Sequence, residues 1–344
     1  MTLPLSPPYP PMEALLVARL PEGPGWQYEP KWDGFRCLAF RDGPAVHLQS
    51  KAGQPLGRYF PELVEAVGGL GPRRLVLDGE ILVPVDGRAS FDDLLQRIHP
   101  APSRVRRLAG ERPALFIAFD LLATPRGRRL VGSPLRERRA ALETLAGRAF
   151  RQEGRLVLSR VTHDRAKAQA WLQESGGSVD GVVAKRLDAG YLAGERGGMQ
   201  KVKRERTADC VVGGFRYAAA GRALGSLLLG LYDESGLLHH VGFAASFRRA
   251  ERREILPRLL PLVKEPGFTG RAPGGPSRWS RREETVWEPL LPRLVVEVRY
   301  THFTGGRFRH GTQVVRWRPD TDPRRCTLAQ VEAESRIPLD RWLS

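Results

Sequence analysis

Apolar and polar residues alternate in short runs through the first part of the chain, which is the pattern of β-strands with one buried face. These runs cover residues 27–40, 45–50, 75–83 and 114–122. The sequences Arg-Asp-Gly-Pro at 41–44 and Val-Asp-Gly-Arg at 85–88 are typical of turns.

Helices are predicted where a capping residue precedes a run with helical spacing. Ser90 precedes one such run and has Asp93 three residues later. A second begins after Ser133-Pro134 and is predicted to end at Gly147, and a third covers about 164–175. The first two hundred residues therefore predict a mixed α+β domain of antiparallel sheets with flanking helices.

The pattern changes after about residue 207. Short strand patterns with glycine-rich turns are interrupted by one helical pattern at 249–260, and they occupy residues 210–219, 226–233, 237–246 and 293–303. Strands of this number and length predict a small closed β-barrel. We expect an α+β domain over residues 1–207 and a barrel over 208–344, with the proline-rich opening through Pro11 as an extended surface arm.

Length and charge narrow the function. The chain has 344 residues, of which 41% are hydrophobic, which is enough to bury two cores. A net charge of +17 indicates a polyanionic partner, most commonly nucleic acid, although a generally basic proteome is the alternative. Arginine-rich stretches at 104–108, 126–130, 248–254 and 278–283 predict contacts with a duplex backbone.

Other features bear on the compartment. Cys37, Cys210 and Cys326 are far apart and form no C-x-x-C pair, which argues against a disulfide framework or a zinc site. The N-terminus lacks the basic start and apolar core of a secretory signal, and no apolar run approaches a membrane span. We expect a cytoplasmic protein that binds no membrane.

Residues 29–36, Glu-Pro-Lys-Trp-Asp-Gly-Phe-Arg, place Lys31 between two carboxylates and ahead of Gly34. Lysine, with a reference pKa near ~10.4, becomes a nucleophile only where burial, nearby cations or a metal favour the free amine. Gly34 would let the backbone approach a ligand closely. The K-x-D-G pattern is weak by itself, since a surface lysine beside a hairpin turn also fits it.

This stretch resembles motif I of the lysine-dependent nucleotidyltransferases, which include ATP-dependent DNA ligases, RNA ligases and mRNA-capping enzymes. Later stretches resemble the other family motifs in order. They are Ser50-Lys51-Ala52-Gly53, Asp78-Gly79-Glu80, Ala118-Phe119-Asp120, residues 180–185 (Asp-Gly-Val-Val-Ala-Lys), Lys201-Val202-Lys203 and residues 316–320 (Arg-Trp-Arg-Pro-Asp). The likeness spans nearly the whole chain and is greatest to short bacterial ATP-dependent DNA ligases.

The resemblance implies an adenylation domain followed by an OB-fold barrel. It implies that Lys31 attacks the α-phosphate of ATP, with Mg²⁺ or Mn²⁺ present, to form a lysyl-AMP. AMP would then pass to the 5′-phosphate of a nick in double-stranded DNA, and the neighbouring 3′-hydroxyl would displace it. We expect a monomer that acts in DNA repair near the nucleoid and binds DNA without regard to sequence.

The resemblance also implies residue roles. Metal would be held by Glu80 and Asp180. The α-phosphate would be held by Lys185, Lys201 and Lys203, which would also favour the neutral amine of Lys31. Adenine would stack on Phe119 and be read by Glu29, while Arg36 and Lys51 would lie near the ribose and the 5′-phosphate. Arg318 would orient pyrophosphate, and the family pattern places Asp33 and Asp320 with the catalytic residues.

Each role has a plainer alternative: Glu80 as an exposed strand end, the lysines as a solvated basic face, and Phe119 as core. The chain also departs from the usual family pattern at four positions, where it has Lys51 for arginine, Asp180 for glutamate, Met199 for tryptophan and Thr321 for lysine. An RNA ligase or capping guanylyltransferase, and a noncatalytic DNA-binding module with a decayed nucleotide site, remain the rival functions.

Overall fold

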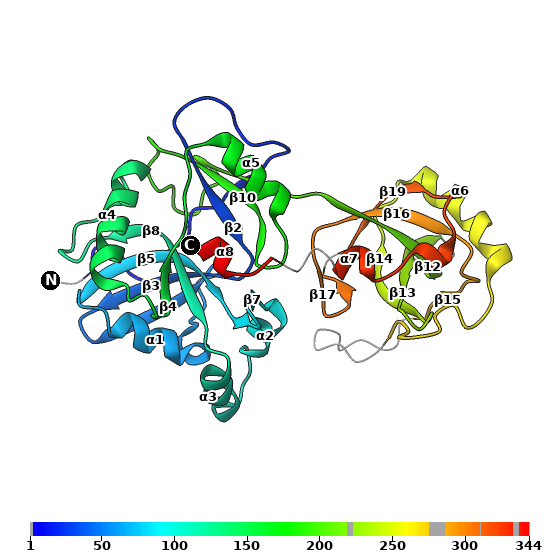
Figure 1. The fold of residues 1–344 in the computed structure, drawn as a ribbon, viewed down its shortest axis with the longest axis horizontal. Helices are drawn as coiled ribbons and strands as arrows, with labels where there is room; N and C mark the ends of the chain where they lie inside the picture. The colour runs from blue at the N-terminus through cyan, green and yellow to red at the C-terminus, as the bar shows by residue number, and fades with distance from the viewer. Residues whose placement is uncertain (1–2, 219–222, 275–285, 310, 333–336, 344) are drawn as a thin grey trace. The chain divides into compact units, whose positions relative to one another are not determined.

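The computed structural model describes residues 3–218, 223–274, 286–309, 311–332 and 337–343, and the arginine-rich stretch at 278–283 lies outside them. The chain forms two compact units, Met1–Arg204 with Ser335–Ser344, and Glu205–Glu334 (Figure 1). The division falls close to the predicted boundary at 207/208. The structure differs from that prediction at the C-terminus, where Leu339 and Trp342 bury their side chains in the first unit.

One sheet of the first unit carries the motif I lysine. Its strands lie in the order β1 (Leu15–Leu16), β11 (Met199–Lys203), β10 (Val179–Arg186) and β2 (Trp26–Trp32). β10 is antiparallel to both of its long neighbours. One face of the sheet packs into an apolar cluster together with helix α5 (Arg165–Glu174), which matches the helix predicted at about 164–175 and is capped by Asp164.

The second sheet has five strands in the order β4 (Ala45–Ser50), β3 (Phe35–Asp42), β5 (Arg74–Leu82), β8 (Leu115–Ala123) and β9 (Leu156–Leu158). It is antiparallel except for the β8–β9 pair. The long run predicted at 27–40 is thus two strands, broken at Asp33-Gly34, that belong to different sheets. This unit also contains two helices that the pattern did not predict, α1 (Pro61–Gly68) and α3 (Pro102–Glu111). Two short strands, β6 (Pro84–Val85) and β7 (Arg88–Ala89), belong to it as well.

The predicted helices are present with small differences. Helix α2 (Phe91–Gln96) begins after Ser90, whose hydroxyl accepts a hydrogen bond from the backbone N–H of Asp93 at 3.2 Å. Helix α4 (Leu135–Ala149) starts where predicted but continues past Gly147, and no side chain caps its start. A glycine within the last turn is tolerated there because the helix packs its buried leucines against β8.

The proline-rich opening is not a surface arm. Leu5 and Met12 are buried in a cluster with residues of β3, β5 and β8. The backbone of Tyr9 and the side-chain amide of Gln49 exchange two hydrogen bonds of 2.8 and 2.7 Å. The surface prediction was wrong because the apolar residues between the prolines find partners on the second sheet.

The second unit is built on a sheet in the order β14 (Leu238–Ala244), β13 (Leu224–Tyr232), β12 (Arg206–Tyr217), β16 (Val295–Tyr300) and β19 (Gln313–Trp317), with β15 (Glu288–Pro289) beside β12. Helix α6 (Arg249–Leu259) matches the predicted one. The remaining elements are β17 (Phe303–Thr304), β18 (Arg307–Phe308) and α7 (Ala329–Glu332), and the 3₁₀ turns of the chain lie at Gly57–Tyr59, Leu260–Leu262 and Pro323–Arg325.

The predicted closed barrel was wrong for the residues that the structure describes. A single isolated bridge, Ala244 with Thr312, connects the β14 side to the β19 side of this sheet. β19 has only five residues and its ladder pairs with β16 alone. The sheet therefore stays open along that edge. No helix in the described ranges has the length and apolarity needed to span a membrane.

Candidate active site

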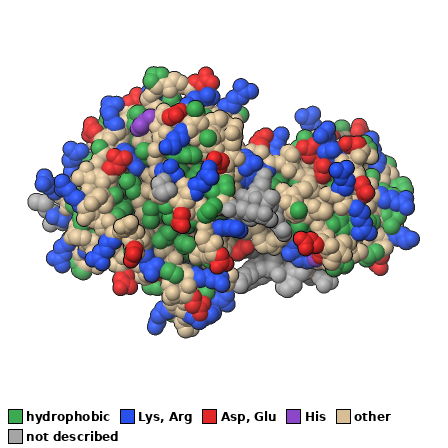
Figure 2. Space-filling model, in the orientation of Figure 1, with side chains coloured by type: hydrophobic (Ala, Val, Ile, Leu, Met, Phe, Trp, Pro, Cys, Tyr) green, Lys and Arg blue, Asp and Glu red, His purple; other side chains and the backbone are tan. Residues whose placement is uncertain are grey.

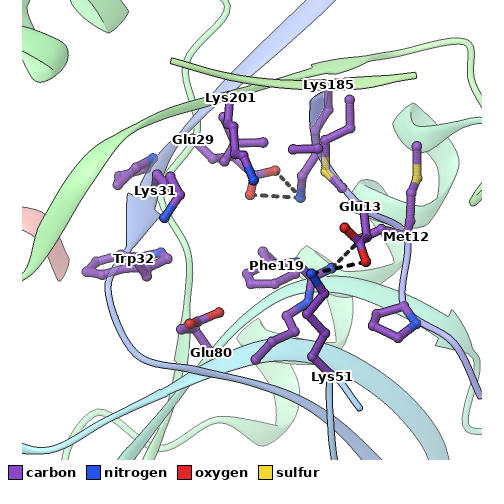
Figure 3. A pocket seen from close by; sticks show the side chains of 16 residues that line it. Met12, Glu13, Glu29, Lys31, Trp32, Lys51, Glu80, Phe119, Lys185 and Lys201 are labelled. Carbon is purple, nitrogen blue, oxygen red and sulfur yellow. Dashed lines mark hydrogen bonds and ion pairs between the residues drawn. The ribbon is translucent and has the colours of Figure 1, made fainter. Parts of the chain in front are cut away.

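A cavity of about 200 Å³ opens in the first unit at the face of the sheet that carries Lys31 (Figure 3). Lys31 and Lys201 enter it from β2 and β11, and Glu80 and Phe119 enter it from β5 and β8. Eight of the predicted residues line it, namely Glu29, Lys31, Arg36, Lys51, Glu80, Phe119, Lys185 and Lys201. The motifs that are far apart in sequence therefore meet in one place.

Strand register explains why the motif residues share a face. Lys31 on β2 and Lys203 on β11 both lie opposite Gly181 of β10, while Glu29 and Lys201 both lie opposite Val183. Because side chains alternate along a strand, the patterns E-x-K and K-x-K each place both charges on the cavity side. The intervening residues, such as Val202, face the apolar cluster on the other side.

Lys31 shares a carboxylate with Lys203. Oδ2 of Asp180 lies 2.5 Å from Nζ of Lys31 and 3.1 Å from Nζ of Lys203. Burial lowers the pKa of Lys31, but the attraction and hydrogen bond of Asp180 outweigh burial and leave that pKa raised above its ordinary value. The expectation that neighbouring lysines keep Lys31 neutral is therefore not met in this state.

A β-bulge aims Asp180 at the lysines. Val179 pairs with Trp32 and Gly181 with Lys31, so two steps along β10 match one step along β2 and Asp180 is the extra residue. A Cβ on Gly181 would lie 2.0 Å from the carbonyl oxygen of Val202, so only glycine lets β11 come this close. The Asp-Gly pair thus places a carboxylate between two lysines on neighbouring strands.

Glu29 and Lys185 form a buried ion pair at the inner end of the cavity. Nζ of Lys185 lies 2.8 Å from Oε1 and 2.9 Å from Oε2 of Glu29, and the side-chain amide of Gln27 also donates to Glu29. The same ammonium lies 4.5 Å from the centroid of the Phe119 ring. The residues expected to read adenine and to hold phosphate are thus engaged with each other.

Phe119 reaches the cavity through a second bulge. Asp78 pairs with Asp120 and Gly79 with Ala118, which leaves Phe119 as the extra residue of β8. The guanidinium carbon of Arg36 also lies 4.5 Å from its ring centroid. Two cations therefore lie at the ring in this state, and a stacked base would have to displace at least one of them.

Asp78 fixes the Arg36 side chain. Nε and Nη2 of Arg36 each lie 2.6 Å from a carboxylate oxygen of Asp78, and the Tyr191 hydroxyl donates to the same carboxylate at 2.6 Å. Burial lowers the pKa of Arg36, but Asp78 outweighs it, so that this pKa is raised. Arg36 is a fixed charge at the cavity wall.

Glu80 lies directly opposite Arg36 in the β3–β5 ladder. Burial raises the pKa of Glu80 to about 7, although Arg36 and Lys31 oppose the shift. Its Oε1 accepts a hydrogen bond of 3.2 Å from the backbone N–H of Gly34. A Cβ on Gly34 would lie 2.1 Å from the carbonyl oxygen of Ile81, so this glycine is required for the close approach of the motif I loop to β5.

Two further lysines lie at the cavity. Lys51 is exposed and pairs with Glu13 at 3.0 Å, and that contact lowers the pKa of Glu13. Burial lowers the pKa of Lys201, and Lys31 and Lys203 lower it further. Within the part of the chain that the structure describes, no carboxylate lies within ion-pair distance of Lys201. Lys201 is therefore a charge that an incoming anion can neutralise.

The charges of the cavity fit a nucleotide triphosphate and a divalent cation. Lys31, Lys51 and Lys201 converge on it and match phosphate oxygens. Glu80, with its pKa raised to about 7, is a carboxylate that lacks full compensation and would be stabilised by a metal ion. Asp180 supplies a second hard oxygen ligand at the lysines.

Three other predicted residues, Asp33, Arg318 and Asp320, do not line the cavity. Asp33 follows the cavity residue Trp32, and its backbone N–H donates to the carbonyl of Ser178 at 3.2 Å. The Asp33 carboxylate nevertheless lies near the site, where it helps to raise the pKa of Lys31 and of Glu80. Arg318 and Asp320 belong to the second unit, where Arg318 forms ion pairs with Asp209 at 3.0 Å and with Asp320 at 3.1 Å. These contacts raise the pKa of Arg318.

Sequence reasoning missed several contributors. Glu13 and Met12 come from the proline-rich segment, and Tyr191 buttresses Asp78 from a loop after β10. Asp78 was also given no role, and it is the one of these residues that the sequence could have indicated, because it lies two residues before Glu80 on the same strand. The others come from irregular segments without a periodic pattern.

Comparisons with known proteins show the family to which the chain belongs. The family description "ATP dependent DNA ligase domain" matches residues 14–203, and "ATP dependent DNA ligase C terminal region" matches residues 220–321. The chain is 46% identical over 353 residues to DNA ligase C2 of Mycolicibacterium smegmatis, covering 97% of both chains. The chain belongs to the ATP-dependent DNA ligase family.

Two further relatives extend the comparison. The ligase is 33% identical over 307 residues to the multifunctional non-homologous end joining DNA repair protein LigD of Mycobacterium tuberculosis, covering 87% of this chain and 37% of that longer protein. A solved structure from a study of Lig E DNA ligases shares the fold, with a TM-score of 0.52 and 16% identity over 89% of this chain and all of that one. The predicted adenylation and OB-fold classes are confirmed, although the strands of the second unit do not close into a barrel in the described residues. Ligase activity on DNA and the use of ATP with a divalent metal are confirmed as well.

The raised pKa of Glu80 predicts a pH-dependent stability. The folded protein binds this proton more tightly than the unfolded chain, whose pKa is near 4.5, so stability is lost as pH rises through about 7. Glu80→Gln should therefore unfold several degrees above the wild type at pH 8 and at nearly the same temperature at pH 5, measured by calorimetry. Glu65→Gln, an exposed residue of α1, is the matched control, and an equal response of the two variants would contradict the assignment.

Proposed function

We propose that Lys31 is the residue that becomes adenylated and that the ligase seals nicks in double-stranded DNA through this covalent intermediate. The observation that carries the proposal is the shared carboxylate of Asp180, which holds the Lys31 amine at the cavity mouth beside Lys203. A surface lysine beside a turn would have no such partner. Phosphoryl transfer needs mainly positioning and charge neutralisation, and both are available here.

The first step requires Lys31 to lose a proton. Nζ releases it toward Oδ2 of Asp180, the acceptor 2.5 Å away, and the nitrogen lone pair then bonds to the α-phosphorus of ATP. The bond from that phosphorus to the pyrophosphate oxygen breaks. A divalent cation held by Glu80 and Asp180 would neutralise phosphate charge, and Lys201 and Lys203 lie beside Lys31 to hold the phosphate oxygens.

The base would be held at the inner end of the cavity. Phe119 offers a ring face there, and Glu29 offers an acceptor for the edge of the base. Adenine would displace the ammonium of Lys185 from the ring, which frees Lys185 to turn toward the α-phosphate. Arg36, fixed by Asp78, and the exposed Lys51 would border the ribose and the approaching 5′-phosphate.

The other substrate is the DNA backbone. On the face shown in Figure 2, Lys and Arg side chains are spread over both units and interspersed with acidic ones. The net charge of +17 attracts a duplex without reading its bases. We propose sequence-nonspecific binding by a monomer, with Arg318 of the second unit serving the pyrophosphate during the first step. A role in DNA repair draws support from the likeness to LigD, a DNA repair protein. We propose that this role is carried out in the cytoplasm.

The covalent step is tested by intact mass spectrometry after incubation with ATP and Mg²⁺ or Mn²⁺. The wild type should carry one AMP, and peptide mapping should place it on Lys31. Lys31→Ala should carry none, because Lys203, the other lysine at the Asp180 carboxylate, lies on β11 and would hold phosphate oxygens and not attack the phosphorus. Lys264→Ala, which removes an exposed lysine of the second unit, should label as the wild type does. Labelling by GTP and not by ATP would favour a capping-type enzyme, and equal labelling of Lys31→Ala would favour a noncatalytic module.

DNA binding is tested by titrating nicked duplexes of unrelated sequence at several salt concentrations. Each phosphate contact contributes about −0.9 to the slope of log affinity against log salt, so affinity should fall at least about tenfold between 50 and 200 mM. The unrelated sequences should agree within about twofold at each salt concentration, because phosphate contacts carry no sequence information. A flat salt response, or a strong preference for one sequence, would contradict backbone recognition.

A further inference from the structure

The last residues of the chain leave the second unit and return to the first (Figure 1). Helix α8 (Asp340–Leu343) carries Trp342, which is 1% exposed, and Leu339 just before it is 2% exposed. Both join the apolar cluster behind the sheet that carries Lys31. That cluster also contains Trp32, Val179 and Val202, each a chain neighbour of a charged residue of the site.

A first chain of hydrogen bonds leads from this segment to the motif I loop. The backbone N–H of Leu339 donates to the carbonyl of Gly87 in the β6–β7 turn at 2.7 Å. From the same hairpin, the N–H of Ala89 donates to the Ser178 hydroxyl at 3.0 Å. The carbonyl of Ser178 then accepts the N–H of Asp33 at 3.2 Å. Ser178 lies two residues before Asp180, and Asp33 lies two residues after Lys31. This path therefore reaches the backbone next to both members of the Lys31–Asp180 pair.

A second path reaches β2 from the other end of α8. The Arg160 guanidinium donates to the backbone carbonyl of Arg341 at 2.5 Å. Its neighbour Ser159 accepts a hydrogen bond of 2.9 Å from the indole N–H of Trp32, the residue after Lys31. The backbone of the C-terminal segment is thereby connected to β2.

We propose that the C-terminal segment 337–343 is a brace of the adenylation site, and that Leu339 and Trp342 are positioning residues which hold Lys31 against Asp180 from behind the sheet. The inference rests on the proposed role of Lys31. The segment lies beyond residue 321, where the match to the ligase C-terminal region ends. This brace makes the adenylation site of the first unit depend on residues that follow the whole second unit in the sequence.

The brace acts by packing. Within the described residues the Trp342 indole nitrogen has no hydrogen-bond partner, so its aromatic surface and not its N–H provides the contact. Removing such a side chain leaves a cavity in the apolar cluster that also contains Trp32, and the surrounding strands relax into it. A shift of about 1 Å at the nucleophile can reduce a rate by up to about a hundredfold.

The test uses the full chain and single-turnover self-adenylation with labelled ATP. The amplitude of the reaction reports the fraction of folded, competent protein, and the rate constant reports the geometry of Lys31. Trp342→Ala and Leu339→Ala should reduce the rate constant at least about tenfold at saturating ATP, with little change in half-saturating ATP. Trp342→Phe should restore most of the rate, because it returns an aromatic ring without the unpartnered N–H.

Two matched variants separate positioning from general destabilisation. Leu63→Ala empties a fully buried site in a different apolar cluster, which packs against the second sheet, and should lower the unfolding temperature while leaving the rate constant unchanged. Arg341→Ala removes an exposed ion pair with Glu174 but keeps the backbone carbonyl that Arg160 binds, so it should behave as the wild type.

The outcomes distinguish this inference from the proposed function. If the wild type labels, Lys31→Ala does not, and Trp342→Ala keeps the wild-type rate constant, the brace is overturned while the lysyl-AMP chemistry stands. Equal losses of rate constant in Trp342→Ala and Leu63→Ala would also overturn it. If Lys31→Ala labels as well as the wild type, the proposed function itself fails.

Discussion

The site depends on one carboxylate placed between two amines. Asp180 lies at a bulge of β10, with Lys31 and Lys203 on the strands at either side of it and both within ion-pair distance of the same oxygen. An isolated lysine at a cavity mouth would sample many rotamers, whereas this one is held by a short ion pair. The bulge, the close approach at Gly181 and the packing behind the sheet all serve this arrangement.

The ion pair with Asp180 also opposes the first step of the reaction. The Asp180 contact that fixes Lys31 also raises its pKa, and a protonated amine cannot attack phosphorus. Most other cations of the site are also paired: Lys185 with Glu29, Arg36 with Asp78, and Lys51 with Glu13. The cavity is thus a set of internal ion pairs that a triphosphate and a metal can exchange for new ones. Glu80 and Lys201 are the least compensated charges of the site. Glu80 is suited to bind a cation, and Lys201 is suited to bind an anion.

The sequence predicted the charged and aromatic residues of the site better than it predicted the structure that supports them. All the site residues were found through family likeness. Strand alternation is consistent with the pairing of Glu29 with Lys31 and of Lys201 with Lys203, because a period of two does not depend on the tertiary fold. It could not have given Phe119 or Asp180, since each lies at a bulge that breaks the alternation. The helix start at Ser90 was predictable because the cap is a local interaction.

Long-range features could not be predicted in this way. Tyr191 and Glu13 come from irregular segments, and Trp342 comes from a segment separated from its partners by the entire second unit. The open edge between β14 and β19 depends on strand length and pairing, which periodicity does not fix. The central claim, that Asp180 holds Lys31 as an ammonium, is tested most directly by an NMR titration of the Lys31 Nζ in the wild type and in Asp180→Asn. The account predicts a raised pKa in the wild type and a clearly lower pKa in the variant, where burial acts without the strongest of its counter-charges and only Glu80 and Asp33 still oppose it. The same pKa in both proteins would contradict it.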